Sequence, residues 1–195
     1  MKLLTFAFVL VAAISIVAQE PDRWRGMVLD ESTTEDAIKV FGQPKKEQMN
    51  RLWPNGPVSS RLSNQHKKKI FKTLEFQFKK DDGVQKAILA YLNDKLVMIT
   101  LDLKSGDVSP NGLSNIYGID FVYQRTEMFG TGGGYPVVYG LLGTSERSFV
   151  SSFGSILSKS MGILGKAASY PGKVEFIDLI SRSALENKDG SNILK

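Results

Sequence analysis

The sequence contains no cysteine and only one histidine among its 195 residues. Without cysteine the chain can form no disulfide and no thiolate metal site, and it has neither a cysteine nucleophile nor a cysteine for lipid attachment. The single histidine, His66, precedes three lysines that oppose its protonation, and no orienting carboxylate lies beside it. We therefore expect no Ser-His-Asp site. Asp81 and Asp82 lack the ladder of an EF-hand, and a hairpin turn accounts for both.

Sequence signatures of nucleotide binding and covalent catalysis are also missing. The glycine run 130–134 precedes a segment with the pattern of a strand, whereas a dinucleotide fingerprint needs a helix there. Gly165-Lys166 lacks the upstream glycine and the following hydroxyl residue of a P-loop. Neither a Ser-x-x-Lys pair nor a Gly-x-Ser-x-Gly elbow occurs. We therefore predict a protein that is not an enzyme and has no cofactor, metal site or catalytic residue.

The chain begins with Lys2 and an uncharged apolar run from Leu3 to Val17. This order is typical of a secretory signal peptide. The run is shorter than the roughly 20 residues that a membrane-spanning helix needs. We expect cleavage after Ala18 or Gln19 and release into a bacterial periplasm or the exterior. The alternative is an uncleaved signal that anchors the protein in the inner membrane.

Residues 32–44, STTEDAIKVFGQP, have the pattern of a short helix with both ends marked. Ser32 and Glu35 have the spacing of a capping box, in which each side chain satisfies an amide of the first turn. Apolar residues then recur at helical spacing. Gly42 can adopt the left-handed conformation that ends a helix, and Pro44 cannot continue one. The segment is therefore a fold marker and not an active motif.

After this helix the pattern changes to alternation. We expect a polar loop over residues 45–70, with a short strand at Met49–Trp53. Three strands follow it, and together they predict an antiparallel meander with turns at 81–83 and at Asn93-Asp94. The first strand is expected to have one buried and one wet face, the middle one is apolar on both faces as a central strand is, and the third alternates like the first. The expected strands cover residues 73–79, 84–92 and 97–103.

The second part of the chain repeats some of this pattern. Residues 109–118 match 33–42 in a hydroxyl cap, an apolar pair, an aromatic residue and a terminal glycine. Pro110 suits the first position of a helix. A helix is also expected over residues 155–169, followed at the end by a polar tail from Ser181. The expected strands of this half cover residues 119–124, 135–142, 147–153 and 173–180.

Together these elements predict an α+β protein, in which a short N-terminal helix packs on an antiparallel β-meander. A tandem repeat of that unit in the second half is one alternative, and a chance match is the other. The expected divisions are a signal peptide at 1–18, a helix-plus-meander unit at 19–106, a second α+β half at 107–181 and a polar tail at 182–195.

Two sets of residues are candidates for contact with a partner. One is the basic cluster, a solvated charged segment or a contact for an anionic membrane surface or an acidic protein; it comprises Arg61, Lys67, Lys68, Lys69 and Lys72. The other is a group of loop-flanking aromatics, either core residues or interface anchors; it comprises Trp24, Trp53, Tyr135 and Tyr139. The net charge of +5 is a mild excess that does not require a nucleic-acid partner, and an exported protein would not meet one. We therefore expect no nucleic-acid binding.

The sequence resembles the BamE/SmpA family and its relative, the β-lactamase inhibitor protein fold, over residues 32–103. The resemblance is carried by the capped helix start at Ser32–Ala37, the helix end Phe41–Pro44, Asp82-Gly83 and the strand residues Val97–Ile99. It implies a non-enzymatic module that binds other proteins near the outer membrane. The family is typically anchored through an N-terminal lipidated cysteine, which this chain lacks. A free periplasmic or secreted binding protein is therefore expected.

The alternative to a protein-binding module is a hydrolase or small-ligand binder. It would use carboxylates brought together at strand ends, and it requires a pocket in which at least two of them converge. The carboxylates in question are Asp102, Asp107, Asp120 and Glu127.

Overall fold

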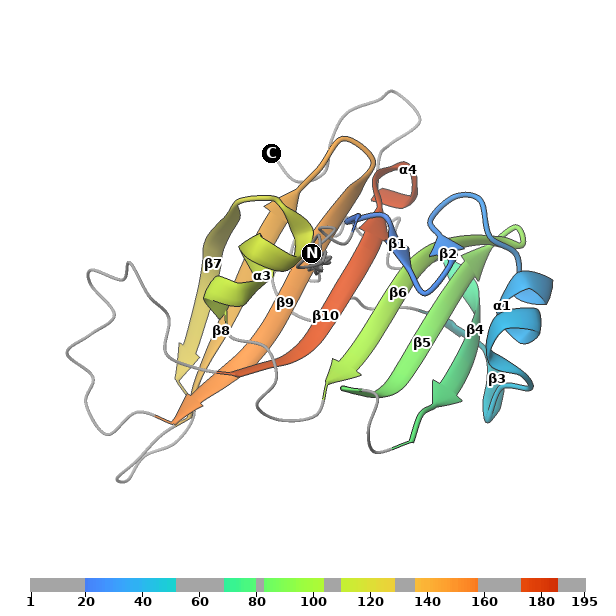
Figure 1. Ribbon diagram of the computed structural model, residues 1–195, viewed down its shortest axis with the longest axis horizontal. Helices are drawn as coiled ribbons and strands as arrows, with labels where there is room; N and C mark the ends of the chain where they lie inside the picture. The colour runs from blue at the N-terminus through green and yellow to red at the C-terminus, as the bar shows by residue number, and fades with distance from the viewer. Residues whose placement is uncertain are drawn as a thin grey trace, which may run out of the picture.

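Strands dominate the part of the chain that the structure, a computed structural model, describes (Figure 1). That part consists of residues 20–51, 69–79, 83–103, 110–128, 136–157 and 173–185. Two short strands, β1 (Arg23–Trp24) and β2 (Met27–Val28), form a hairpin. The other eight form one sheet in the order β3-β4-β5-β6-β10-β9-β8-β7, in which every neighbouring pair is antiparallel.

The sheet strands are β3 (Lys46–Arg51), β4 (Ile70–Gln77), β5 (Val84–Leu92), β6 (Lys95–Leu103), β7 (Phe121–Met128), β8 (Pro136–Thr144), β9 (Ser148–Leu157) and β10 (Lys173–Ser181). The helices are α1 (Thr34–Phe41), α3 (Pro110–Tyr117) and α4 (Arg182–Leu185).

The prediction of an α+β fold is wrong, because antiparallel sheet makes up most of the described structure. The longest described helices have eight residues each. The helix expected at 155–169 fails at its start, since Ile156 and Leu157 extend β9 and pair with Val137 and Pro136 of β8. Pairing along a neighbouring strand overrides the weak helical spacing there. The rest of that expected helix lies outside the described residues.

The two halves of the chain follow the same order of elements and meet at the middle of the sheet. Helix α1 precedes β3 to β6, and α3 precedes β7 to β10. The last strand of each half, β6 and β10, pair with each other, so that the two meanders form one continuous sheet. The division expected at 106–107 lies outside the described residues. At the other expected division, Arg182–Leu185 form α4, and Ala184 is buried.

The larger core lies on the face of the sheet that carries α1, α3 and the β1–β2 hairpin (Figure 1). Trp24 stacks on Phe41 with ring centroids 5.4 Å apart, and Phe41 in turn lies 5.2 Å from Phe76 of β4. Leu74, Leu89 and Ile99 bring the same face of β4, β5 and β6 into this core. We call this face the helix side.

A smaller core lies on the opposite face, so the wet face expected on β4 is confirmed at Gln77 and Lys79, which are exposed, and wrong at Thr73, which is buried. Phe71, Ala90, Met98 and Ile180 alternate with residues of the larger core and are buried. Thr73 and Thr100 of the same face are buried as well. The predicted two-sided burial of β5 is confirmed around Ala90, whereas Ile88 and Leu92 of that face are half-buried and Gln85 is exposed.

The capping box of α1 forms one residue later than expected. Asp36 Oδ2 accepts the amide of Thr33 at 2.9 Å, and Thr33 Oγ1 accepts the amide of Asp36 at 3.3 Å. Thr33 has the extended backbone of an N-cap, with φ −101° and ψ 174°. Ser32 instead accepts the amide of Val28 at 2.9 Å and so holds the exit of the hairpin. The cap predicted from Ser32 and Glu35 is therefore wrong by one position.

The expected helix end and the second turn are confirmed. Gly42 has a positive φ of 80°, and its amide donates to the carbonyl of Ile38 at 2.8 Å. Pro44 follows before β3 begins. At the β5–β6 turn Asn93 and Asp94 have φ values of 52° and 59°. Asp94 also accepts a hydrogen bond from the Thr34 hydroxyl at 2.8 Å, which ties this turn to the start of α1.

Replacing Gly42 with valine should lower the free energy of unfolding by about 1–3 kcal/mol. Its φ of 80° and ψ of −162° lie in a region that is essentially restricted to glycine. A Cβ placed there meets no atom within 4 Å, so the cost comes from the backbone and not from a clash. Urea unfolding measures it. Lys39→Val, on the exposed part of the same helix, is the control, and an equal loss in both variants would contradict this reading.

Stability should also depend on the carboxylate of Asp36. Its pKa lies below the ordinary value of 3.8, mainly because it accepts the backbone amide of Thr33 and also the hydroxyl. A lowered pKa means that the stabilisation is present above the unfolded-state pKa and is lost as the pH falls through the folded one. The difference between wild type and Asp36→Asn should therefore shrink on acidification. Unfolding titrations test this, and a difference that stays constant as the pH falls would contradict it.

Candidate functional site

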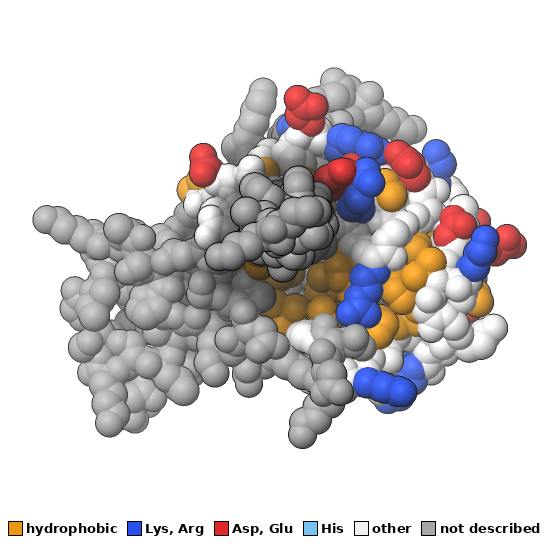
Figure 2. Space-filling view, in the orientation of Figure 1, with side chains coloured by type: hydrophobic (Ala, Val, Ile, Leu, Met, Phe, Trp, Pro, Cys, Tyr) orange, Lys and Arg blue, Asp and Glu red, His pale blue; other side chains and the backbone are white. Residues whose placement is uncertain are grey.

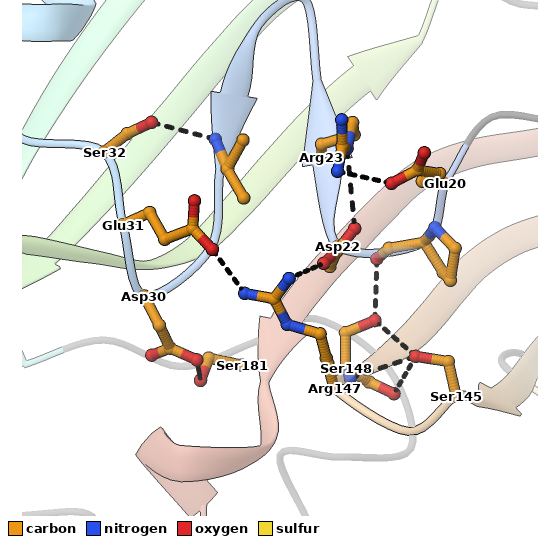
Figure 3. A network of polar contacts seen from close by, with 12 residues as sticks. Glu20, Asp22, Arg23, Asp30, Glu31, Ser32, Ser145, Arg147, Ser148 and Ser181 are labelled. Carbon is orange, nitrogen blue, oxygen red and sulfur yellow. Dashed lines mark hydrogen bonds and ion pairs between the residues drawn. The ribbon is translucent and has the colours of Figure 1, made fainter.

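A network of polar contacts fastens the N-terminal hairpin to the second half of the chain (Figure 3). At its centre is Arg147, in the turn between β8 and β9. One guanidinium nitrogen lies 3.1 Å from Asp22 Oδ2, and another donates to Glu31 Oε1 at 2.7 Å. The Asp22 side chain is only 8% exposed, so Arg147 supplies a counter-charge to a carboxylate that has little water. The bond to Glu31 and the nearby Asp22 charge raise the pKa of Arg147.

Serine hydroxyls continue this network on both sides of Arg147. Ser181 and Ser183 each donate to one oxygen of Asp30, both at 2.6 Å. Ser148 donates to the carbonyl of Pro21 at 2.8 Å. We call these contacts, from Pro21–Glu31 to Arg147–Ser148 and Ser181–Ser183, the N-terminal clasp.

The contacts of the N-terminal clasp are hydrogen bonds and ion pairs of the kind that stabilise a fold. Its hydroxyls donate to carboxylate and carbonyl oxygens, and Arg147 holds two carboxylates. In the described ranges no group of three His, Cys, Asp or Glu side chains is placed to hold a metal ion. Every contact of the clasp joins residues far apart in the sequence, so its effect is to hold the hairpin across the larger core.

Replacing Arg147 with glutamine should loosen the hairpin while leaving the sheet intact. Asp22 would lose the closer of its two cations, keeping only Arg23 Nε at 3.8 Å, and Glu31 would lose its hydrogen bond. The expected result is a lower melting temperature and faster hydrogen exchange at the amide of Leu29, which donates to the Asp22 carbonyl. Lys86→Gln, which removes the pair with Asp102 on the other face, is the control. Unchanged exchange at Leu29 would contradict the fastening role.

Of the expected basic cluster, the structure describes Lys69 and Lys72. Lys72 lies on β4, and its Nζ is 3.1 Å from Glu47 Oε1 of β3. One of the two described charges is therefore balanced within the sheet. The other three members, Arg61, Lys67 and Lys68, lie outside the described residues.

Of the expected interface aromatics, the structure describes the side chain of Trp24. Trp24 is 6% exposed and belongs to the larger core, with Arg25 lying 5.0 Å above its ring. Tyr139 lies in β8, where its backbone pairs with β7 and β9. Trp53 and Tyr135 lie outside the described residues.

The carboxylates of the hydrolase alternative do not converge within the described part of the chain. Asp102 of β6 accepts from Gln85 Nε2 at 2.6 Å and lies 3.5 Å from Lys86 Nζ. Glu127 is on β7, four strand spacings away, or about 19 Å across the sheet. Asp120 is exposed just before β7. Asp107 lies outside the described residues.

An exposed surface that sequence reasoning did not identify lies at the β3 edge of the sheet. Strand β3 pairs only with β4 in the described structure, so its outer side has no ladder partner there. Met49 is 66% exposed and Ile70, on β4, is 55% exposed. Glu47, Met49 and Arg51 alternate along β3 and share the helix side, on which Lys72 and Ile70 are their cross-strand neighbours.

We call Glu47, Met49, Arg51, Ile70 and Lys72 the edge cluster. It has two exposed apolar side chains with charged ones beside them. The viewed face in Figure 2, which is the helix side, likewise shows apolar side chains next to Lys and Arg. The sequence signal was present in KEQMNR, where opposite charges stand two residues on either side of a methionine. The expected strand, Met49–Trp53, left out Glu47, so the arrangement of opposite charges on both sides of Met49 within one strand was not apparent.

Comparisons with known proteins give no family. No family model matches the sequence, and no curated protein matches it significantly. Among solved structures, the chain is similar to an extracellular protein containing an SCP domain from Bacillus anthracis, with 8% identity and a TM-score of 0.39. The similarity covers 78% of this chain but only 44% of that one. Likeness at this level carries no argument about fold or function. No described helix is both long and apolar enough to cross a membrane.

Proposed function

We propose that this chain is an exported, non-enzymatic protein that binds another protein through the edge cluster. The observation that carries the proposal is the open edge at β3, where two apolar side chains that are each more than half exposed stand among charged ones. Export is supported by the apolar run Leu3–Val17 after Lys2. The resemblance to the BamE/SmpA family supports partner binding near the bacterial envelope.

The backbone of β3 offers one part of the binding energy. The outer side of an edge strand presents amide and carbonyl groups that an added strand can pair with. Recognition by strand addition takes its affinity from these hydrogen bonds and its specificity from alternate side chains. On β3 the alternate side chains of the helix side are Glu47, Met49 and Arg51.

The side chains of the edge cluster offer the other part. Met49 pairs with Lys72 in register, and Ile70 is the diagonal neighbour of Met49, at a typical distance of about 7–8 Å. Methionine and arginine are enriched in protein interfaces, in which an apolar centre is enclosed by a polar rim. The partner is therefore expected to be an envelope or secreted protein. Contact with an anionic membrane would instead depend on the whole basic cluster, of which Lys69 and Lys72 are described.

Site-specific cross-linking tests this function. A photoreactive residue is placed at Met49 in the full chain, and irradiation is carried out in the envelope fraction and in the purified protein. Val122 is the matched control, because it is 60% exposed on β7, at the other edge of the sheet. A defined protein adduct from position 49 and none from 122 is the expected result. No protein adduct from position 49 in either sample, or equal adducts from both positions, would refute it.

A further inference from the structure

We propose that the partner of the edge cluster is a second copy of this chain, with the two β3 strands antiparallel about a twofold axis through Met49. The dimer inference rests on the proposed function, since it takes the edge cluster as a protein-binding surface. It goes further because it names the protein that binds there. The evidence is the charge order along β3, which is complementary to itself in one register.

The register follows from the faces of the strand. Directly opposite residues of an antiparallel pair point to the same face. A twofold axis perpendicular to the sheet keeps each residue of the copy on the same face as in the first chain. Odd-numbered residues of β3 can therefore lie opposite only odd-numbered residues of the copy, and even-numbered ones opposite even-numbered ones. With the axis at Met49, Glu47 lies opposite Arg51 of the copy, and Arg51 lies opposite Glu47 of the copy. Gln48 and Asn50 pair in the same way on the other face.

This register gives favourable contacts at every position from 47 to 51. Opposite charges directly across a strand pair stabilise it, and like charges destabilise it. The two ion pairs flank a contact between the two Met49 side chains, which are 66% exposed in the single chain. The partner of Glu47 within its own chain, Lys72, is on the same face, so each carboxylate would lie between two cations.

The other registers lack this match. An axis at Gln48 places Glu47 opposite Met49 and brings Arg51 opposite Lys45 of the copy. An axis at Glu47 sets the two Glu47 carboxylates against each other. The charges on and beside β3 therefore disfavour these two pairings and favour the one centred on Met49.

The interface would be narrow and the dimer correspondingly reversible. Its core is a six-residue edge strand with Met49 and Ile70 beside it. Stable complexes usually bury about 800 Å² on each partner. Association should therefore depend on concentration, and it should weaken with salt because its ion pairs are exposed.

Charge reversal provides a direct test by sedimentation equilibrium of the full chain. Glu47→Arg sets Arg against Arg in the homodimer, and Arg51→Glu sets Glu against Glu. Each variant should raise the dimer dissociation constant at least about tenfold, a factor that corresponds to about 1.4 kcal/mol. An equimolar mixture should form a heterodimer, because both opposing pairs then carry opposite charges. Glu35→Arg, an exposed glutamate on α1, is the control and should dimerise as the wild type does.

The results of these experiments distinguish a failure of the dimer inference from a failure of the proposed function and from misfolding of a variant. Arg51→Glu leaves the Glu47–Lys72 pair in place, so it tests the interface even if Glu47→Arg lowers the melting temperature. A wild-type dimer that neither variant weakens, or variants that do not associate when mixed, would overturn the inference. A wild-type chain that stays monomeric while position 49 cross-links to a different protein would overturn it too, yet would support the proposed function.

Discussion

The pairing of β6 with β10 is the contact on which the rest of the structure depends. It sets Leu101 against Ile177 and Ile99 against Leu179, and these four side chains form the middle of the larger core. On the other face Thr100 donates to Asp178 at 2.6 Å, and both side chains are buried. Without this pairing each half would expose an apolar inner strand as an edge, the kind of edge that promotes aggregation.

Strands and turns that depend on neighbouring residues could be predicted from the sequence, whereas the pairing of β6 with β10 could not. Residues 84–92 alternate too little for a wet face, and Asn93-Asp94 tolerate positive φ, so β5 and its turn follow from neighbours in the chain. Which strand lies beside β6 depends instead on β10, whose Asp178 is 78 residues from Thr100. The helical pattern at 155–169 misled for the same reason, because β8 lies beside Ile156 and Leu157 and fixes their conformation.

The candidate site shows the same division between local and distant information. The sequence left Trp24 open between core and interface, because the rings it packs against, Phe41 and Phe78, are distant in sequence. The edge cluster was missed because the edge position of β3 is a property of the whole sheet. The cap of α1 differed by one residue, since Ser32 is engaged by Val28 of the hairpin and is not free to cap.

The N-terminal clasp bears on the order in which the chain can fold. Residues near the start of the described chain are held by residues near its end, with separations of 151 and 153 between Asp30 and its two serines. Such contacts are entropically costly to close and are characteristic of slow folding. During synthesis the contacts of Asp30 cannot form until Ser181 and Ser183 have been added to the chain. Until then the larger core lacks the contacts that hold its hairpin cover, so its apolar strands are exposed to aggregation for as long as the C-terminal strand is missing.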